Sequence, residues 1–158
     1  MTAQADIPRL PLDLTVNGVA RSAVIEPREL LLDVLRDRFG LKGTKRSCDV
    51  QVCGACTVLI DGLPASACST LAADAQGRSV LTIEGVAQDG VLDPVQRAFV
   101  EHGALQCGFC TPGFVLAVKA LLAFNPAPTD DEIKHFLRGN ICRCTGYVKI
   151  LEAVKSLV

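Results

Sequence analysis

The chain has 158 residues, enough for one ordinary domain or two small ones with a real hydrophobic core. Apolar residues make up 49% of it, which excludes a disordered tail, and aromatic residues only 4%, so the core must be aliphatic. The formal net charge is −1 without a long basic run, which argues against nucleic acid as the main partner.

The cysteines need an explanation that suits their compartment. No apolar run approaches the ~20 residues of a membrane-spanning helix, and MTAQADIPRLPLDLTV lacks the charged and apolar regions of a signal peptide. We therefore expect a cytoplasmic protein without a membrane span, whose thiols are kept reduced. The chain nevertheless has 8 cysteines, which in that compartment favours metal or iron–sulfur binding over disulfides.

The first half of the chain is predicted to be rich in β-strands. A hairpin is expected in LDLTVNGVARSAV because Asn17-Gly18 lies between two apolar runs. A helix is expected over Glu29–Phe39, with Gly40 as its stop. The segment CTVLIDGLPASAC predicts a second hairpin with Asp61-Gly62 at its turn, and Ser79–Gly85 predicts a further strand. Together these elements predict a small mixed sheet packed on a helix.

The second half is predicted to be helical. Four helices are expected, from Asp93-Pro94 to about His102, from about Pro112 to Phe124, from a Thr129/Glu132 capping box to just before Gly139, and from about Tyr147 to Leu157. The segments CTPGF and CTGY resemble each other, which suggests two helix pairs around a local pseudo-twofold axis, with the cysteines at helix N-termini. Chance similarity between such short stretches is the alternative.

The cysteines fall into two groups of four. The first group is Cys48, Cys53, Cys56 and Cys68. Its C-x4-C-x2-C…C order matches plant-type [2Fe–2S] spacing, and small residues around it would let backbone N–H groups approach sulfur: Gly43, Gly54 and Ala55. A zinc ribbon favours paired knuckles at both ends, and a disulfide scaffold would need export, so both alternatives fit less well.

The second group has the pattern C-x2-C…C-x-C and consists of Cys107, Cys110, Cys142 and Cys144. The C-x-C pair is too tight for a usual zinc knuckle but can hold one iron. Each oxidised [2Fe–2S] core carries about +2 and its four thiolates carry −4. Two clusters would therefore move the formal net charge from −1 to about −5.

Three segments, GTKRSCDVQVCGACTVLIDG, LQCGFCTPGF and GNICRCTGY, closely resemble the iron–sulfur small subunit of the molybdenum hydroxylase family. This family includes xanthine dehydrogenase, carbon monoxide dehydrogenase and N-heterocycle dehydrogenases. The resemblance covers roughly residues 10–158. It implies an α+β architecture: an N-terminal β-grasp, ferredoxin-like [2Fe–2S] domain over residues 10–85, then a C-terminal four-helix [2Fe–2S] domain over residues 86–158 with pseudo-twofold helix pairs.

The resemblance also implies ligands and partners. The first group of cysteines would bind the ferredoxin-like cluster, and the second group would bind the cluster of the helical domain. The second cluster would lie beside the molybdopterin cofactor of a large subunit, with Gln106 and Cys144 near the pterin, although Gln106 could also be a solvated loop amide. The first cluster would face FAD on a medium subunit, in a heterotrimer or a dimer of heterotrimers.

The chain is expected to carry no substrate-binding catalytic site of its own. It has no GxGxxG fingerprint, no P-loop and no nucleophile–base pair. Its two histidines are expected to be non-ligands, His102 partly buried and His135 solvated. We therefore expect an electron-transfer subunit of an oxidoreductase, which passes electrons from molybdenum through both clusters to flavin. The alternatives are a free-standing two-cluster ferredoxin, with a charged rather than apolar surface, and a zinc-binding interaction module.

Overall fold

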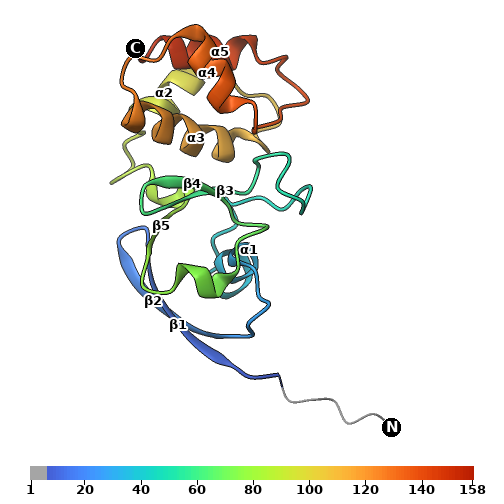
Figure 1. The fold of residues 1–158 in the computed structure, drawn as a ribbon. Coiled ribbons are helices and arrows are strands. Elements are labelled where there is room, and N and C mark those ends of the chain that lie inside the picture. Colours follow the sequence, from blue (N-terminus) through green and yellow to red (C-terminus); the bar gives the residue numbers. More distant parts are fainter. Residues whose placement is uncertain (1–6) are drawn as a thin grey trace.

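The computed structural model describes residues 7–158. Strands and helices separate into two layers: a five-stranded sheet with a short helix on one side, and a group of four helices on the other (Figure 1). The strand order is β2-β1-β5-β3-β4. Among the described residues, no helix is both long and apolar enough to cross a membrane.

The first predicted hairpin is confirmed. Strand β1 (Leu10–Val16) pairs antiparallel with β2 (Val19–Ile25) through the predicted Asn17-Gly18 turn. Both turn residues have positive φ, 53° and 79°, as a two-residue turn of the Asn-Gly type requires. Alternate residues at the end of β1 are buried, so this strand contributes one face to the core.

The helix expected over Glu29–Phe39 exists, but only its start is α-helical. Helix α1 (Leu31–Asp33) continues directly into a π-helical turn, η1 (Val34–Arg38), in which the Phe39 N–H bonds to the Val34 carbonyl at 3.0 Å. Gly40, with φ 73°, follows the turn as expected. The buried residues of this segment, Leu31, Leu32, Val34 and Leu35, have a spacing that also fits an α-helix, so hydrophobic spacing does not distinguish the two.

The second predicted hairpin is also confirmed, as β3 (Thr57–Ile60) and β4 (Leu63–Ser66). After the 3-10 turn η2 (Ala72–Ala75), strand β5 (Ser79–Leu81) runs parallel to β1 and antiparallel to β3, which makes the sheet mixed.

The strand expected over Ser79–Gly85 is wrong in its second half, where the 3-10 turn η3 (Ile83–Gly85) replaces it. The backbone N–H of Thr82 bonds to the Asn17 side chain at 2.8 Å, and the Thr82 carbonyl accepts from Gly85 N–H at 3.0 Å. Thr82 therefore does not continue the strand pairing, because its backbone N–H is already bonded to Asn17, a residue of the first hairpin.

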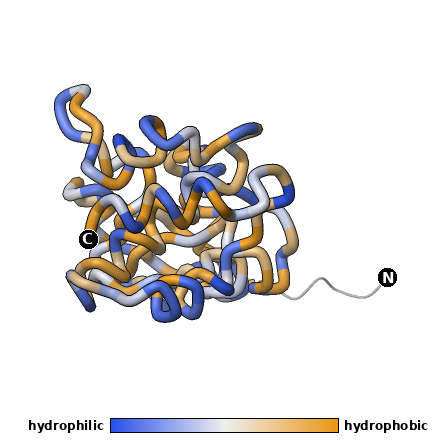
Figure 2. The backbone as a smooth tube through the Cα atoms, turned by 90° about the horizontal axis from the view of Figure 1, so that it is seen from above, coloured by the Kyte–Doolittle hydropathy of each residue, from blue (hydrophilic) through white to orange (hydrophobic). Residues whose placement is uncertain are grey.

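All four predicted helices of the second half form. They are α2 (Pro94–Glu101), α3 (Thr111–Phe124), α4 (Asp130–Leu137) and α5 (Val148–Lys155). The predicted Thr129/Glu132 capping box is present at α4, and Asp93 forms a second capping box at α2 with Gln96. Helices α2 and α4 each pack against both α3 and α5. Seen from above, hydrophobic and hydrophilic stretches alternate along the tube (Figure 2), and helices α2, α4 and α5 each bury one apolar face.

Two hydrophobic cores lie on opposite faces of the sheet. One is formed by β1, α1 and the inner residues of β3, and the other by the four helices. Strand β3 is buried along its whole length because Val58 and Ile60 face the first core, while Leu59 faces the helices. Helix α3 covers β3 and β4 (Figure 1). The sheet and the helices are therefore held together by continuous packing through β3.

Candidate metal centres

The structure brings the first four cysteines together from two segments. Cys48, Cys53 and Cys56 lie in the loop between η1 and β3, and Cys68 follows β4. The thiols of Cys48 and Cys53 lie within hydrogen-bonding reach of each other, as do those of Cys56 and Cys68. The hairpin turn therefore delivers Cys68 to the loop, and the thiols are arranged as two pairs.

The loop is shaped to present backbone N–H groups to sulfur. Asp49, Gln51 and Gly54 all have positive φ, which bends the chain repeatedly around the thiols. Three N–H groups lie near the Cys48 sulfur, those of Val50, Val52 and Cys53, with the Val52 nitrogen at 3.4 Å. These hydrogen bonds lower the pKa of Cys48 to about 6. The loop thus stabilises a negatively charged sulfur before any metal is considered.

The inner pair of the first group has the opposite environment. Cys56 and Cys68 are buried. Burial raises the pKa of Cys56 to about 12 because a thiolate would lose its hydration. The buried thiolate that metal ligation requires at Cys56 therefore needs the positive charge of a metal ion to stabilise it.

The second four cysteines also form two pairs. Cys107 and Cys110 directly precede α3, while Cys142 and Cys144 lie in the loop between α4 and α5. The sulfurs of Cys107 and Cys144 are 3.5 Å apart and both residues are exposed. The thiols of Cys110 and Cys142 contact each other more deeply in the structure. This group therefore has an outer pair and an inner pair, like the first.

The expected position at helix N-termini holds for one half of this group. Cys110 is the N-cap of α3, whereas Cys144 is separated from α5 by a turn of three residues, Thr145 to Tyr147. Burial raises the pKa of Cys110 to about 12. Burial also acts to raise the pKa of Cys142, but hydrogen bonds from Thr145, Cys144 and Cys110 together outweigh it and the net shift is downward. The turn before α5 thus helps to lower the pKa of Cys142, as the N–H-rich loop lowers the pKa of Cys48.

The paired thiols suit a two-iron cluster. A [2Fe–2S] cluster is held by four thiolates, two to each iron, and bridging sulfides complete the coordination. Each group supplies two such pairs, so the donor set fits the cluster.

Thr44, in the segment preceding Cys48, has a buried hydroxyl without a hydrogen-bond partner among the described residues.

The two cysteine groups are joined by a direct contact that sequence reasoning missed. The N–H of Ile141 donates to the carbonyl of Cys53 at 2.9 Å, and the Asn140 side chain donates to the Gly54 carbonyl at 3.2 Å. Asn140 and Gly54 are 86 positions apart along the chain. No local pattern signals such a contact, and only the glycines in both loops hint at a close approach.

The structure also shows how far the other residues considered in the sequence analysis are exposed. Gln106 is exposed and precedes Cys107 of the outer pair. His102 is half-buried and His135 is exposed, as expected for each. Gln106 immediately precedes Cys107, whose sulfur lies 3.5 Å from that of Cys144.

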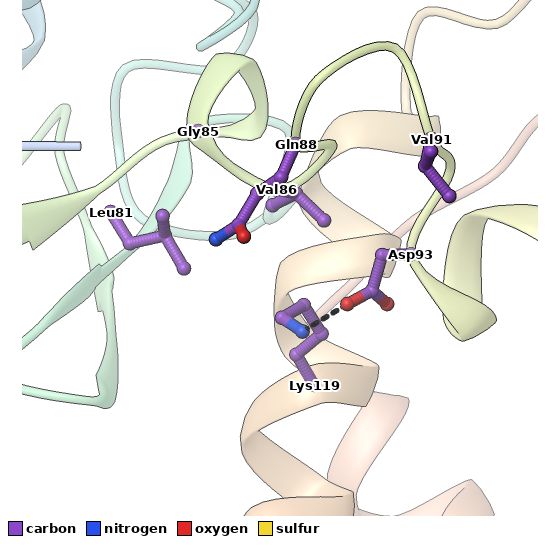
Figure 3. A pocket seen from close by; sticks show the side chains of 7 residues that line it. All are labelled: Leu81, Gly85, Val86, Gln88, Val91, Asp93 and Lys119. Carbon is purple, nitrogen blue, oxygen red and sulfur yellow. Dashed lines mark hydrogen bonds and ion pairs between the residues drawn. The ribbon is translucent and has the colours of Figure 1, made fainter. Parts of the chain in front are cut away.

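A pocket of about 490 Å³ lies between the end of β5 and α3, and no cysteine lines it (Figure 3). Lys119 of α3 reaches the carboxylate of Asp93, with 2.6 Å between nitrogen and oxygen. The other oxygen of Asp93 accepts from the Val95 N–H at the start of α2. The charged groups of this pocket thus satisfy each other and tie α2 to α3.

Comparisons with known proteins agree with this geometry. Residues 29–101 match the family model described as "2Fe-2S iron-sulfur cluster binding domain", and residues 82–155 match the one described as "[2Fe-2S] binding domain". These two matches place the chain in the iron–sulfur class of proteins, with two [2Fe–2S]-binding domains.

Relatives narrow this class further. The chain is 50% identical to the nicotinate dehydrogenase small FeS subunit of Eubacterium barkeri, covering 95% of this chain and 96% of that one. It is 49% identical to the nicotine 6-hydroxylase small subunit of Paenarthrobacter nicotinovorans, over 98% of this chain and 93% of the relative. The chain belongs to the family of small iron–sulfur subunits of the molybdenum hydroxylases. It is thus an electron-transfer component of an oxidoreductase.

Solved structures share the fold. A chain of quinoline 2-oxidoreductase from Pseudomonas putida 86 superposes with a TM-score of 0.90 at 47% identity, over 93% of this chain and 91% of that one. Aldehyde oxidoreductase from Desulfovibrio gigas superposes with a TM-score of 0.88 at 42% identity, but this chain covers only 16% of it. The same fold therefore occurs both as a separate chain and as a small part of a longer one.

Proposed function

We propose that the eight cysteines hold two [2Fe–2S] clusters, one in each group. The ligands of the first would be Cys48, Cys53, Cys56 and Cys68, and those of the second Cys107, Cys110, Cys142 and Cys144. Such clusters accept and release one electron at a time. The observation that carries this proposal is the arrangement of every cysteine in a thiol pair, with two pairs in each group.

We propose further that the chain connects two other cofactors carried by partner subunits. A large subunit would present molybdopterin to the exposed Cys107–Cys144 pair, with Gln106 and Cys144 closest to the pterin. Apolar residues next to this pair favour a covered surface over an open one, because Leu105, Phe109, Ile141 and Val148 are all exposed.

A medium subunit with FAD would face the first cysteine group. Val50 and Val52 in that loop are 67% and 57% exposed, which suits burial against a partner rather than permanent contact with water. Apolar exposure at both cysteine groups favours a subunit over a free-standing ferredoxin. The hydrogen bond between Ile141 and Cys53 supports electron passage between the groups, since it joins their loops backbone to backbone.

The proposal extends to the domains and the assembly. Residues 10–85 would form a β-grasp, ferredoxin-like domain, and residues 86–158 a four-helix domain with its helix pairs α2–α3 and α4–α5 related by a pseudo-twofold axis. The separate hydrophobic cores and the mutual packing of the four helices support this division. The eight free cysteines suit a reducing, cytoplasmic setting, and the complex would be a heterotrimer or a dimer of heterotrimers.

Metal analysis of the complex purified from its native host tests the proposal. Two clusters predict about four irons and four labile sulfides per chain, with co-purifying molybdopterin and FAD subunits. Stoichiometric zinc without labile sulfide would overturn the cluster assignment and favour the zinc-binding interaction module. Full iron and sulfide loading in a chain that purifies alone would instead support a free-standing carrier.

A further inference from the structure

The turn between Cys144 and α5 directs hydrogen bonds at one particular sulfur. The Thr145 hydroxyl lies 3.1 Å from the Cys142 sulfur, and the Thr145 nitrogen lies 3.4 Å from it. The backbone N–H of Tyr147 donates to the same Thr145 hydroxyl oxygen at 3.2 Å. Because the oxygen already accepts from Tyr147, the hydroxyl proton is oriented toward sulfur.

Tyr147 is fixed next to Thr145 by contacts of its own ring. Tyr147 has φ 68°, in the left-handed region that residues other than glycine rarely adopt. Its ring packs edge-on against Phe114 with 6.4 Å between centroids, and its phenol oxygen accepts from the Cys142 N–H at 3.1 Å. The ring contacts thus hold Tyr147 in place beside the second cysteine group, and its backbone N–H donates to Thr145.

Thr145 stands out from the other residues near sulfur. Within residues 7–158 it is the one side-chain hydroxyl that donates to a cysteine sulfur. Thr111 follows Cys110 as Thr145 follows Cys144, but Thr111 starts helix α3 and makes no corresponding contact among the described residues. Thr145 is half-buried, so its bond to sulfur is partly shielded from water.

We propose that Thr145 sets the reduction potential of the second cluster through its hydroxyl bond to Cys142, with Tyr147 as a positioning residue. The inference rests on the proposed role of Cys142 as a cluster ligand. A hydrogen bond to a ligating thiolate withdraws negative charge from the cluster and favours the reduced form, which carries one more negative charge. The hydroxyl therefore raises the potential and makes the second cluster a better electron acceptor.

Redox titration of the purified complex, followed by EPR, tests this role. Thr145→Val removes the hydroxyl while keeping the branched shape, and Thr145→Ser keeps the hydroxyl. Thr145→Val should lower the equilibrium constant for reducing the second cluster about tenfold, which is about 59 mV for one electron. Thr145→Ser should stay near the wild-type potential, and the first cluster should keep its potential in both variants.

The variant Tyr147→Phe separates the effect of the Thr145 hydroxyl on the potential from that of the Tyr147 phenol. This variant removes the phenol oxygen but keeps the backbone N–H that orients Thr145. Its second-cluster potential should stay closer to wild type than to Thr145→Val. A larger shift in Tyr147→Phe than in Thr145→Val would assign the control to the phenol and overturn the role of Thr145, as would an unchanged potential in Thr145→Val.

Iron and sulfide analysis of the same samples keeps the two proposals apart. A wild-type complex without two clusters refutes the proposed function, whereas full loading with equal potentials refutes only the role of Thr145. If Thr145→Val loses the second cluster, resonance Raman spectra of the wild-type complex provide a second measurement. Transfer to D2O should shift the Fe–S(Cys) bands of the second cluster, and the shift should persist in Thr145→Ser; absence of a shift in wild type overturns the proposal.

Discussion

At the scale of single residues, the two cysteine groups combine thiols with opposite preferences. Cys48 lies in a loop of N–H donors that favour its thiolate, whereas Cys56 is buried and favours its neutral form. Cys142 and Cys110 repeat this contrast in the second group. Each group therefore contains one thiol that is ready to bind metal and one that becomes charged only when a metal compensates the loss of hydration.

This contrast predicts how the iron-free chain reacts with an alkylating reagent. The pKa of Cys48 is lowered, so its thiolate persists as pH falls until about pH 6, and it should be the first cysteine modified by iodoacetamide at neutral pH. Cys56 and Cys110, with pKa values raised to about 12, should remain unmodified. Peptide mass spectrometry across a pH series measures each rate, and half of the maximal rate at Cys48 should fall near pH 6.

The same shift has a consequence for stability. The folded-state pKa of Cys48 is below that of an ordinary thiol. The Cys48 thiolate therefore stabilises the folded iron-free chain at pH values above the ordinary thiol pKa, and this contribution is lost as pH falls through about 6.

The control for the alkylation experiment is native circular dichroism, which shows whether the sample is folded. Equal alkylation rates at Cys48 and Cys56 in a folded sample would contradict the loop geometry.

At the scale of elements, glycine decides how closely α3 can approach the first cysteine loop. A Cβ atom added at Gly113 would lie 2.2 Å from the Gly54 carbonyl oxygen. One added at Gly54 would lie 2.5 Å from both the Gly139 carbonyl oxygen and the Asn140 side chain. Backbone therefore packs on backbone where the two cysteine groups meet, and neither glycine can gain a side chain without displacing the other half of the chain.

Gly113→Ala should destabilise the protein although it lies in a helix. Alanine is favoured over glycine inside a helix by about 1 kcal/mol, so local propensity alone predicts a gain. The clash with Gly54 should outweigh it, since overpacking costs about 1–3 kcal/mol. Gly139→Ala is the matched control, because its Cβ would meet nothing within 4 Å and its φ is not positive.

Thermal unfolding of the cluster-loaded wild type and both variants measures the difference. A lower midpoint for Gly113→Ala, with Gly139→Ala near wild type, is the expected result. A rise in the midpoint for Gly113→Ala would show that the contact between α3 and the Cys53–Cys56 loop relaxes freely, contrary to the close approach of Gly113 to Gly54.

The elements also show which features the sequence could reveal. The Asn17-Gly18 turn and the Thr129/Glu132 capping box were predicted correctly because their hydrogen bonds are local. The end of β5 was not, because the Asn17 side chain takes the Thr82 N–H from far along the chain. The π turn after α1 was missed for a different reason, since its buried residues have the same spacing in an α-helix.

The cysteine groups illustrate the same limit. Spacing suggested the two groups of four, because 38 residues without cysteine, 69–106, separate Cys68 from Cys107. It did not predict that Cys107 pairs with Cys144 and Cys110 with Cys142, nor that Ile141 bonds to Cys53. Those contacts depend on how four helices and a sheet pack, which no single stretch of sequence encodes.

At the scale of the whole molecule, the two cysteine groups belong to parts with separate cores but a shared seam. The first group lies against the core of the sheet and α1, and the inner cysteines of the second group lie against the helical core. The seam between the parts includes the hydrogen bond from the Asn140 side chain to the Gly54 carbonyl, the close approach of Gly113 to Gly54, and the packing of α3 on β3. Separate cores predict that one cysteine group can be damaged while the other keeps its structure.

A reciprocal pair of cysteine variants tests this independence. Cys107→Ser removes one thiol of the exposed outer pair of the second group, and Cys48→Ser removes one thiol of the outer pair of the first. In the purified complex, Cys107→Ser should abolish or alter the EPR signal of the second cluster and block flavin reduction by substrate. The signal of the first cluster should remain, because its ligands and its core are untouched.

Cys48→Ser should give the mirror result, with loss of the first signal and survival of the second. Substrate should then reduce the second cluster but fail to reduce the flavin, because the proposed path is interrupted beyond it. Loss of both signals in either variant, with circular dichroism unchanged, would mean that the seam makes the two parts one cooperative unit. If the EPR signals of both clusters survive a substitution, the substituted cysteine is not a cluster ligand. That residue would then be removed from the proposed ligand set.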